Sequence, residues 1–170
     1  CRYEGLCEAN SWLRTALHNG SLTEREYHKA LLRLIYRLLF LFVAEDRGAL
    51  QDPAASREAR ERYDEYFSTA RLRRLSRLRS GGSHPDLWRG QRMILSALGD
   101  RGMPQLGIPA LGGLFDPDRR APVIEGAPVT DMLLGAEITN KNLLRAIRHL
   151  AWMLVQGQRA QPIDYRHLGA

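Results

Sequence analysis

The sequence predicts an all-α fold, an irregular multi-helix bundle interrupted by one Gly/Pro-rich excursion. Apolar residues recur at helical spacing through most of the chain, and helix caps and glycine stops bracket those segments. The stretch 99–135 instead carries frequent glycine and proline, which break any long periodicity. Because the chain has 170 residues, 44% of them apolar, we expect one helical domain over 1–170 with an irregular insertion at about 99–135.

Two helices are predicted in the first third of the chain. An amphipathic segment at 8–18 ends at an Asn-Gly turn. The second helix covers 23–47, where Thr23 and Glu26 have the spacing of a capping box and Gly48 provides a C-terminal stop.

The second helix is nearly continuously apolar from residue 30 to residue 44, except for Arg33 and Arg37. These arginines lie four residues apart on one face, so we expect a mostly buried helix that exposes one basic strip. The uninterrupted run 38–44 covers about a third of the ~20 residues that span a bilayer. Any longer window would include both arginines, so no membrane contact is expected.

A third helix is predicted to begin at a Ser56 cap. Its charges alternate in sign and it holds few aliphatic residues, which is typical of a solvated helix. We expect only Tyr63, Tyr66 and Phe67 to be buried.

The stretch 68–79 is the most basic part of the chain, and its leucines Leu72, Leu75 and Leu78 form a three-residue apolar stripe. All five arginines of this stretch lie off the stripe. A further helix is predicted over 85–99, beginning near a proline and ending at a glycine.

The excursion at 99–135 is too long to be an idle loop in a compact domain. Its short apolar pieces are expected either to pack on the helices or to form a small hairpin. A last helix is predicted from a cap at Thr139 or Asn140 to Gly157.

The formal net charge of +6 is carried almost wholly by arginine, because Lys29 and Lys141 are the only lysines. The planar arginine fork suits phosphate and carboxylate, so this composition favours a nucleic-acid partner, although a high-GC genome produces the same bias. Between residues 71 and 92 the only acid is Asp86. The candidate nucleic-acid-binding residues are Arg71, Arg73, Arg74, Arg77, Arg79, Arg89 and Arg92. A solvated basic face, or pairing with acids elsewhere, explains the same arginines.

No complete catalytic constellation is found. No lysine follows a glycine, which disfavours a phosphate-cradling loop, and the five histidines are dispersed. Asp116, Asp118 and Glu125 would suit a divalent metal in a stand-alone enzyme, but Asp before proline more simply starts a turn. Cys7 is expected to be a small buried hydrophobe. We therefore predict no catalytic residue, no metal site and no cofactor for this chain.

Five stretches, in this order, resemble the helical region of large DNA adenine-N6 methyltransferases. These enzymes belong to type II restriction-modification and DISARM-like phage-defence systems. The stretches are LLRLIYRLLFLFVAEDRG (31–48), YFSTARLRRL (66–75), DLWRG (86–90), LGGLFDPD (111–118) and PIDYRHLG (162–169).

The resemblance implies a helical module just upstream of a catalytic domain that binds S-adenosylmethionine. The family's Gly-containing cofactor loop and its Asn-Pro-Pro-Tyr element, which holds the flipped adenine, do not occur here. The implied function is a non-catalytic scaffold that contacts the DNA backbone, with DNA and the parent's own catalytic domain as partners. The parent would be the methyltransferase, with or without a linked endonuclease.

The chain begins at Cys1 and stops at Ala170, and we expect it to be a piece of a larger protein. It opens with no secretory signal and holds only two cysteines, Cys1 and Cys7, so a reduced cytoplasmic setting is expected. The alternative function is a helical protein-interaction module that docks a partner subunit without touching DNA.

Overall fold

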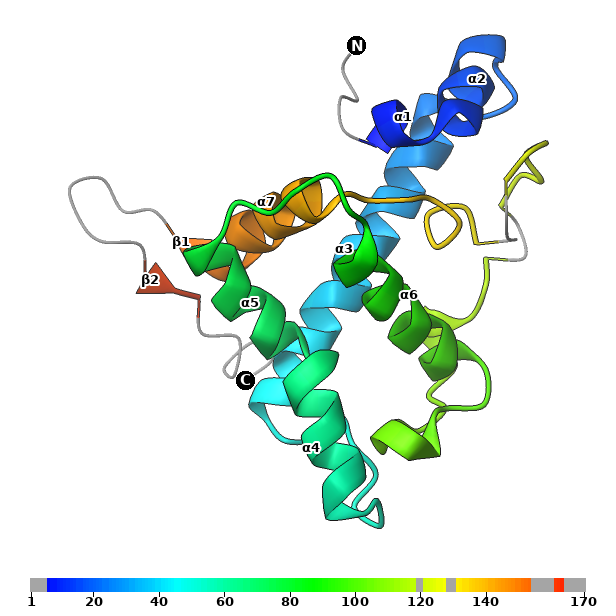
Figure 1. Cartoon of the computed structure of the whole chain (residues 1–170). Coiled ribbons are helices and arrows are strands. Elements are labelled where there is room, and N and C mark those ends of the chain that lie inside the picture. Colours follow the sequence, from blue (N-terminus) through cyan, green and yellow to red (C-terminus); the bar gives the residue numbers. More distant parts are fainter. Residues whose placement is uncertain (1–5, 119–120, 128–130, 154–160, 164–170) are drawn as a thin grey trace.

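The computed structural model describes residues 6–118, 121–127, 131–153 and 161–163, and it confirms an all-α fold (Figure 1). The helices are α1 (Leu6–Ala9), α2 (Ser11–Asn19), α3 (Glu24–Asp46), α4 (Arg57–Tyr66), α5 (Thr69–Leu78), α6 (Asp86–Gly99) and α7 (Asn140–Ala151). Two 3-10 turns, η1 (Pro104–Leu106) and η2 (Gly113–Phe115), and two short strands, β1 (Trp152–Met153) and β2 (Gln161–Pro162), complete the described elements.

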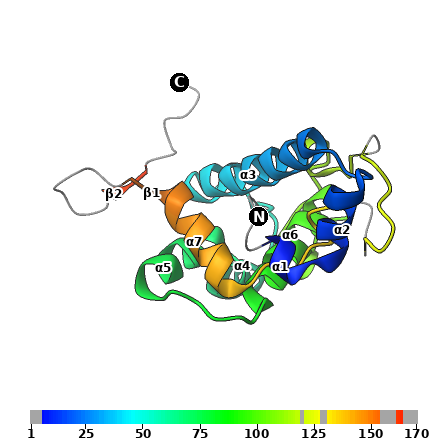
Figure 2. The same ribbon diagram turned by 90° about the horizontal axis from the view of Figure 1, so that it is seen from above.

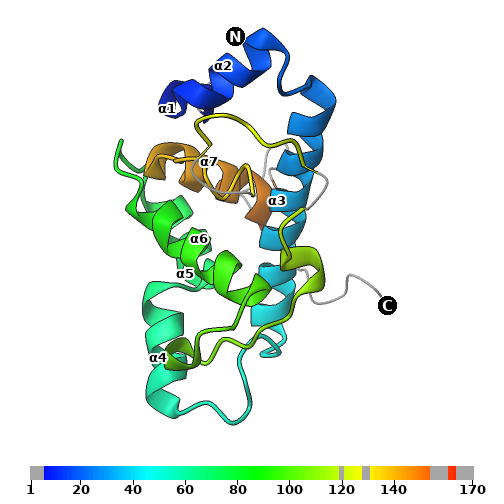
Figure 3. The ribbon, with the colours of Figure 1, turned by 90° about the vertical axis from the view of Figure 1, so that its right-hand side faces the viewer.

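The long helix α3 forms one side of the molecule, and α5, α6 and α7 lie along the other side (Figure 2). The short helices α1 and α2 lie at one end of α3, and α4 lies at the opposite end (Figure 3). Between these layers the core holds fully buried side chains from each, including Leu41, Phe42, Trp88, Leu95 and Ile147. No helix within the described ranges combines the length and apolarity that crossing a bilayer requires.

Both predicted ends of α3 are confirmed. The Thr23 hydroxyl accepts from the Glu26 backbone N–H at 3.2 Å, and the Glu26 carboxylate accepts from the Thr23 N–H at 2.8 Å. At the other end Gly48 adopts φ +62°, and its N–H and that of Ala49 donate to carbonyls of the last turn. This pair of bonds is a Schellman motif, which only a residue tolerant of positive φ allows.

The basic strip expected on α3 is wrong, because Arg37 is only 1% exposed. Its guanidinium donates to the carbonyls of Leu114, Phe115 and Asp116 at 3.0–3.1 Å and pairs with Asp131 at 2.8 Å. Arg33 also donates to carbonyls of this segment. The two arginines therefore anchor the Gly/Pro-rich excursion, whose carbonyls lack partners in regular structure.

In the middle of α3, between residues 31 and 43, the exposed side chains are apolar instead. Leu32, Tyr36 and Phe40 are 51%, 57% and 39% exposed, and successive members of this set are four residues apart. They form one stripe along the helix, which we call the α3 apolar stripe.

The first predicted helix divides into α1 and α2 at Asn10. The buried Asn10 amide donates to the carbonyls of Leu6 and Glu137 at 2.7 and 2.8 Å, and it accepts from the Glu137 N–H at 2.8 Å. The two bonds with Glu137, which lies 127 residues away in the chain, replace continuous helix at this point.

Helix α4 begins at the predicted Ser56 cap, whose hydroxyl accepts from the Ala59 N–H at 3.2 Å. Tyr63 is fully buried, as predicted, and Phe67 is partly buried. Tyr66, the last residue of α4, is 55% exposed, against the prediction.

The apolar stripe predicted for α5 is only partly present. Leu72 is 1% exposed, Leu75 is partly buried, and Leu78 is 73% exposed. A three-residue spacing drifts by about 60° per step around a 3.6-residue helix, so Leu78 has rotated off the face that Leu72 buries. Ser76, four residues after Leu72, is buried in its place.

The excursion packs on the helices through the buried residues Ile108, Phe115 and Ile124. The first of the two arrangements predicted for it is therefore confirmed. The isolated bridge in the described part of this segment joins Met103 to Ile108 across η1, so the pairing is much smaller than a hairpin. Gly99 has no room for a side chain here, because a Cβ would lie 2.4 Å from the Phe115 carbonyl oxygen.

Helix α7 begins after the predicted Thr139 cap but ends at Ala151, earlier than predicted. The next residue, Trp152, begins β1, which pairs antiparallel with β2. The Ala151 carbonyl accepts from the Ile163 N–H at 2.9 Å, so pairing between strands takes over where the helix stops. The rest of the predicted helix, residues 154–157, lies outside the described residues.

Candidate nucleic-acid interface

Helix α5 carries four of the seven candidate arginines and a fifth, Arg79, is its C-cap residue; the N-terminus of the helix is fixed from two sides. The Ser68 hydroxyl caps the helix by accepting from the Arg71 N–H at 3.2 Å. The Glu45 carboxylate, from α3, accepts from the Thr69 N–H, the Thr69 hydroxyl and the Ala70 N–H at 2.7–2.8 Å. Glu45 thus satisfies helix-end donors that would otherwise lack partners.

Glu45 also accepts from the Tyr63 hydroxyl at 2.7 Å. Burial raises the pKa of the Glu45 carboxyl, and its hydrogen bonds with Tyr63, Thr69 and Ala70 counteract part of that rise. Burial and the neighbouring Glu45 charge raise the pKa of Tyr63 far above its ordinary value. The phenol therefore stays protonated around neutral pH and donates its hydrogen bond to Glu45.

The C-terminus of α5 is held by α7. The Arg148 guanidinium donates to the Ser76 and Arg79 carbonyls at 2.6 and 3.2 Å, which places a cation at the negative end of the α5 dipole. The following loop approaches the start of α7 so closely that a Cβ on Gly81 would lie 2.6 Å from the Asn140 carbonyl carbon. Helix α5 is therefore anchored at both ends by side chains from other helices.

Arg73 is engaged inside the fold. Its guanidinium forms a two-pronged ion pair with Asp46, at 2.6 and 3.0 Å, and lies 5.0 Å from the centre of the Phe42 ring. The Asp46 carboxylate neutralises most of the Arg73 charge, so Arg73 is a poor phosphate ligand. The ion pair instead joins α5 to the end of α3.

Arg89 and Arg92, on α6, share one acid. Glu137 lies 3.1 Å from Arg89 and 3.4 Å from Arg92. These two arginines face the segment before α7, and their charge is partly neutralised there. The structure therefore does not join them with the α5 arginines in one unpaired cluster.

The remaining four candidates have no acidic partner among the residues that the structure describes. Arg74, Arg77 and Arg79 are exposed, and Arg71 is partly exposed and donates to the Tyr66 carbonyl at 3.3 Å. None of the four forms an ion pair with a described residue. We call this set, Arg71, Arg74, Arg77 and Arg79, the α5 arginine surface.

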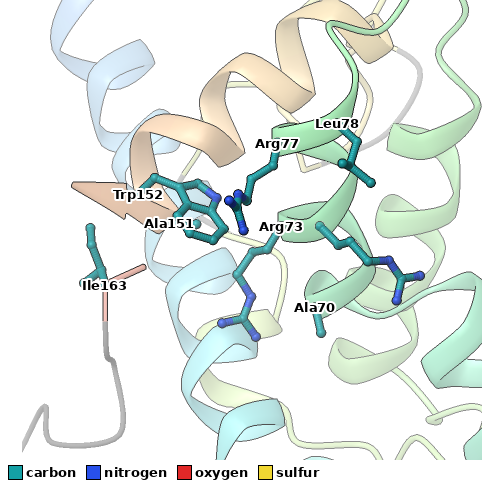
Figure 4. Close-up of a pocket in the computed structure, with 8 residues that line it drawn as sticks. Ala70, Arg73, Arg77, Leu78, Ala151, Trp152 and Ile163 are labelled. Carbon is teal, nitrogen blue, oxygen red and sulfur yellow. The ribbon is translucent and has the colours of Figure 1, made fainter. Parts of the chain in front are cut away.

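A cavity of about 450 Å³ lies between α5 and the β1–β2 pair (Figure 4). Its lining residues are Ala70, Arg73, Arg74, Arg77, Leu78, Ala151, Trp152 and Ile163. Arg77 extends from α5 to the indole of Trp152, 4.6 Å from the ring centre, whereas Arg73 points toward α3. We call this cavity the Trp152 pocket.

Sequence reasoning did not find Trp152, Glu45 or Arg148. Trp152 was assigned to a helix interior, and nothing in its local sequence indicates a strand. Glu45 and Arg148 contact α5 from residues 24 and 72 positions away in the chain, and no spacing rule reports such contacts.

Two of the three acidic residues considered for a metal have other partners, and the third, Glu125, is exposed. Asp118 pairs with Lys29 at 3.0 Å and Arg33 at 3.6 Å, and the Asp116 carboxylate accepts from the Gly113 N–H at the start of η2, at 3.0 Å. Within the described ranges, no three His, Cys, Asp or Glu residues lie close enough together to hold a metal ion. Cys7 is buried, as predicted, and burial raises the pKa of its thiol.

Comparison of the chain with protein-family models, with curated proteins and with solved structures finds no match. The α5 arginine surface and its surroundings therefore carry the functional argument, together with the resemblance described above.

Proposed function

We propose that this chain is a non-catalytic helical module of a cytoplasmic DNA adenine-N6 methyltransferase, and that it contacts DNA phosphates through the α5 arginine surface. The observation that carries the DNA part is a set of four arginines, on α5 and at its C-cap, that pair with no described acid, on a helix anchored at both ends. The methyltransferase part rests on the five ordered sequence stretches.

Phosphate contact needs dense positive charge and fixed geometry, and it needs no base-specific pattern. Helix α5 supplies both, because its position is set by Glu45 and Arg148 and not by the arginines that would bind. An arginine that already holds the fold together, such as Arg73, would lose an ion pair on binding, whereas Arg74 and Arg79 would lose none.

Within the parent enzyme this module would position the catalytic domain on the duplex. S-adenosylmethionine and the flipped adenine would bind in that other domain, so we assign no chemical step to the residues of this chain. The restriction or phage-defence role of the parent follows from the same resemblance.

The DNA contact is tested with a labelled duplex of about 20 base pairs of arbitrary sequence in about 50 mM salt. We expect the chain to bind it, and we expect Arg74→Glu/Arg77→Glu/Arg79→Glu to weaken binding by about 100-fold, because phosphate contacts dominate affinity at low salt. Fluorescence anisotropy provides the dissociation constants.

The control is the double reversal Arg25→Glu/Arg57→Glu, at exposed arginines near the starts of α3 and α4, one of which pairs with Glu61 at 3.1 Å. This variant should lose only a few-fold in affinity, through the change in net charge. Absence of duplex binding at low salt, or equal losses in the two variants, would show that the α5 arginine surface is not the DNA contact.

A second candidate function is a docking module for a partner subunit, and the α3 apolar stripe favours it. Leu32, Tyr36 and Phe40 are large apolar side chains exposed in a row, a feature that marks many interaction surfaces. Leu32→Glu/Tyr36→Glu should then abolish co-purification with subunits encoded beside the parent gene while DNA binding is unchanged. Unaltered co-purification would remove this candidate.

A further inference from the structure

We propose that the Trp152 pocket receives one unstacked nucleotide of a single-stranded segment, with the base against its apolar wall and the phosphate at Arg74 and Arg77. This inference deepens the proposed function and rests on it. It adds a nucleotide site beside the phosphate-contacting surface of α5.

The pocket has the composition that such a ligand needs. Four apolar residues, Ala70, Leu78, Ala151 and Ile163, line it together with the Trp152 indole, and none of the described residues that line it is acidic. A volume of about 450 Å³ lies within the range of small-molecule sites and is ample for one nucleobase with its sugar.

The charged residues of the pocket divide into two roles. Arg73 is committed to Asp46 at 2.6 Å and so forms part of the wall. Arg74 and Arg77 belong to the α5 arginine surface and are available to a phosphate. A nucleotide joins a flat aromatic base to an anionic phosphate. It therefore matches an apolar wall beside two arginines that form no ion pair with a described residue.

Arg77 and Trp152 already form the stacking element. The Arg77 guanidinium carbon lies 4.6 Å from the indole centre, so the two side chains form a cation–π contact in the unliganded protein (Figure 4). Bases stack on both indole rings and guanidinium planes, with little preference for sequence.

The test compares a labelled 12-nucleotide thymidine oligonucleotide with the 20-base-pair duplex, using the 170-residue chain and its Trp152→Leu variant. We expect the variant to bind the oligonucleotide about tenfold more weakly, the usual loss when one base loses an aromatic platform. Duplex binding should stay within twofold, because the α5 arginines remain. Equal affinities of the variant and the original chain for the oligonucleotide would overturn the proposal.

A second measurement does not depend on the folding of the Trp152 variant. In a Trp12→Phe background the remaining tryptophans are Trp152, at the pocket, and Trp88, which is fully buried. The oligonucleotide should then quench and shift tryptophan emission, because a stacked base contacts the Trp152 indole. An unchanged emission spectrum at saturating oligonucleotide would contradict the pocket.

The outcomes separate this inference from the proposed function. Duplex binding that depends on the α5 arginines, without oligonucleotide quenching, would leave the proposed function standing and remove the pocket. Oligonucleotide quenching without any duplex binding would keep the pocket and remove the duplex contact. Failure of both ligands to bind would remove both.

Discussion

Arg37 is the residue that joins α3 to the Gly/Pro-rich excursion. Its side chain makes hydrogen bonds to three consecutive carbonyls and an ion pair with Asp131 at 2.8 Å. Removing one partner of a buried pair leaves the other without compensation, which costs more than the pair itself contributes.

We expect Arg37→Met, which keeps most of the side-chain volume, to lower the free energy of unfolding by about 3 kcal/mol. Urea denaturation followed by circular dichroism measures the change. Arg33→Met is the control, since Arg33 shares carbonyl partners but is partly exposed, and it should cost about 1 kcal/mol. Equal losses in the two variants would show that the position of Arg37 has no special role.

Glu45 is the second residue whose position decides a local structure, because its carboxylate accepts the donors at the start of α5. Glu45→Gln replaces one acceptor oxygen with an NH₂ group that faces donors. Hydrogen exchange should therefore speed up at the Thr69 and Ala70 amides by about tenfold or more, while exchange in α6 stays unchanged. Unaltered protection at these two amides would contradict the assigned cap.

At the scale of the element, α5 offers a comparison of one substitution at two positions. Leu72→Ala removes a fully buried side chain and should lower the free energy of unfolding by about 3 kcal/mol. Leu78→Ala alters a residue that is 73% exposed and should change it by no more than about 0.5 kcal/mol. Thermal and urea unfolding of the two variants measures both, and similar losses would mean that α5 is rotated from the position described.

The cap of α3 makes a prediction about pH. Hydrogen bonds from the Thr23 backbone and hydroxyl lower the pKa of Glu26 below its ordinary value of 4.5. Because the folded pKa is lowered, the stabilising contribution of Glu26 is present above pH 4.5 and is lost as the pH falls through the folded value. An NMR titration of the Glu26 carboxyl should find its midpoint below 4.5, and a midpoint at or above that value would refute the capping box.

Elements with their own local signals were predictable from sequence. The caps at Thr23, Ser56 and Thr139 and the stop at Gly48 lie within a turn of the helices that they bound, so nearby residues specify them. The break at Asn10 depends on the distant Glu137 and was missed, since its cause is tertiary.

At the scale of the whole molecule, the sequence predicts where the candidate site lies but not which of its arginines are engaged in ion pairs. The density of arginine between 71 and 92 is visible in the sequence, but which of them are free is not. Asp46 and Glu137 engage Arg73, Arg89 and Arg92 across the fold, and sequence spacing does not report such pairs. Trp152 reaches Arg77 only because α7 ends before it.

The whole-molecule arrangement separates two surfaces with different chemistry. The α3 apolar stripe lies on the long helix, and the α5 arginine surface lies on a helix of the opposite layer (Figure 2). A module placed between a protein domain and DNA requires two such surfaces. The proposed scaffold can therefore contact both at once.

The salt dependence of duplex binding tests the α5 arginine surface most directly. Each neutralised phosphate contributes about −0.9 to the slope of log affinity against log salt concentration, so four arginines predict a slope near −3.6. Arg74→Glu/Arg77→Glu/Arg79→Glu should flatten that slope by about 2.7, whereas Arg25→Glu/Arg57→Glu should leave it nearly unchanged. A slope that is the same in the chain and in its α5 variant would contradict the assignment.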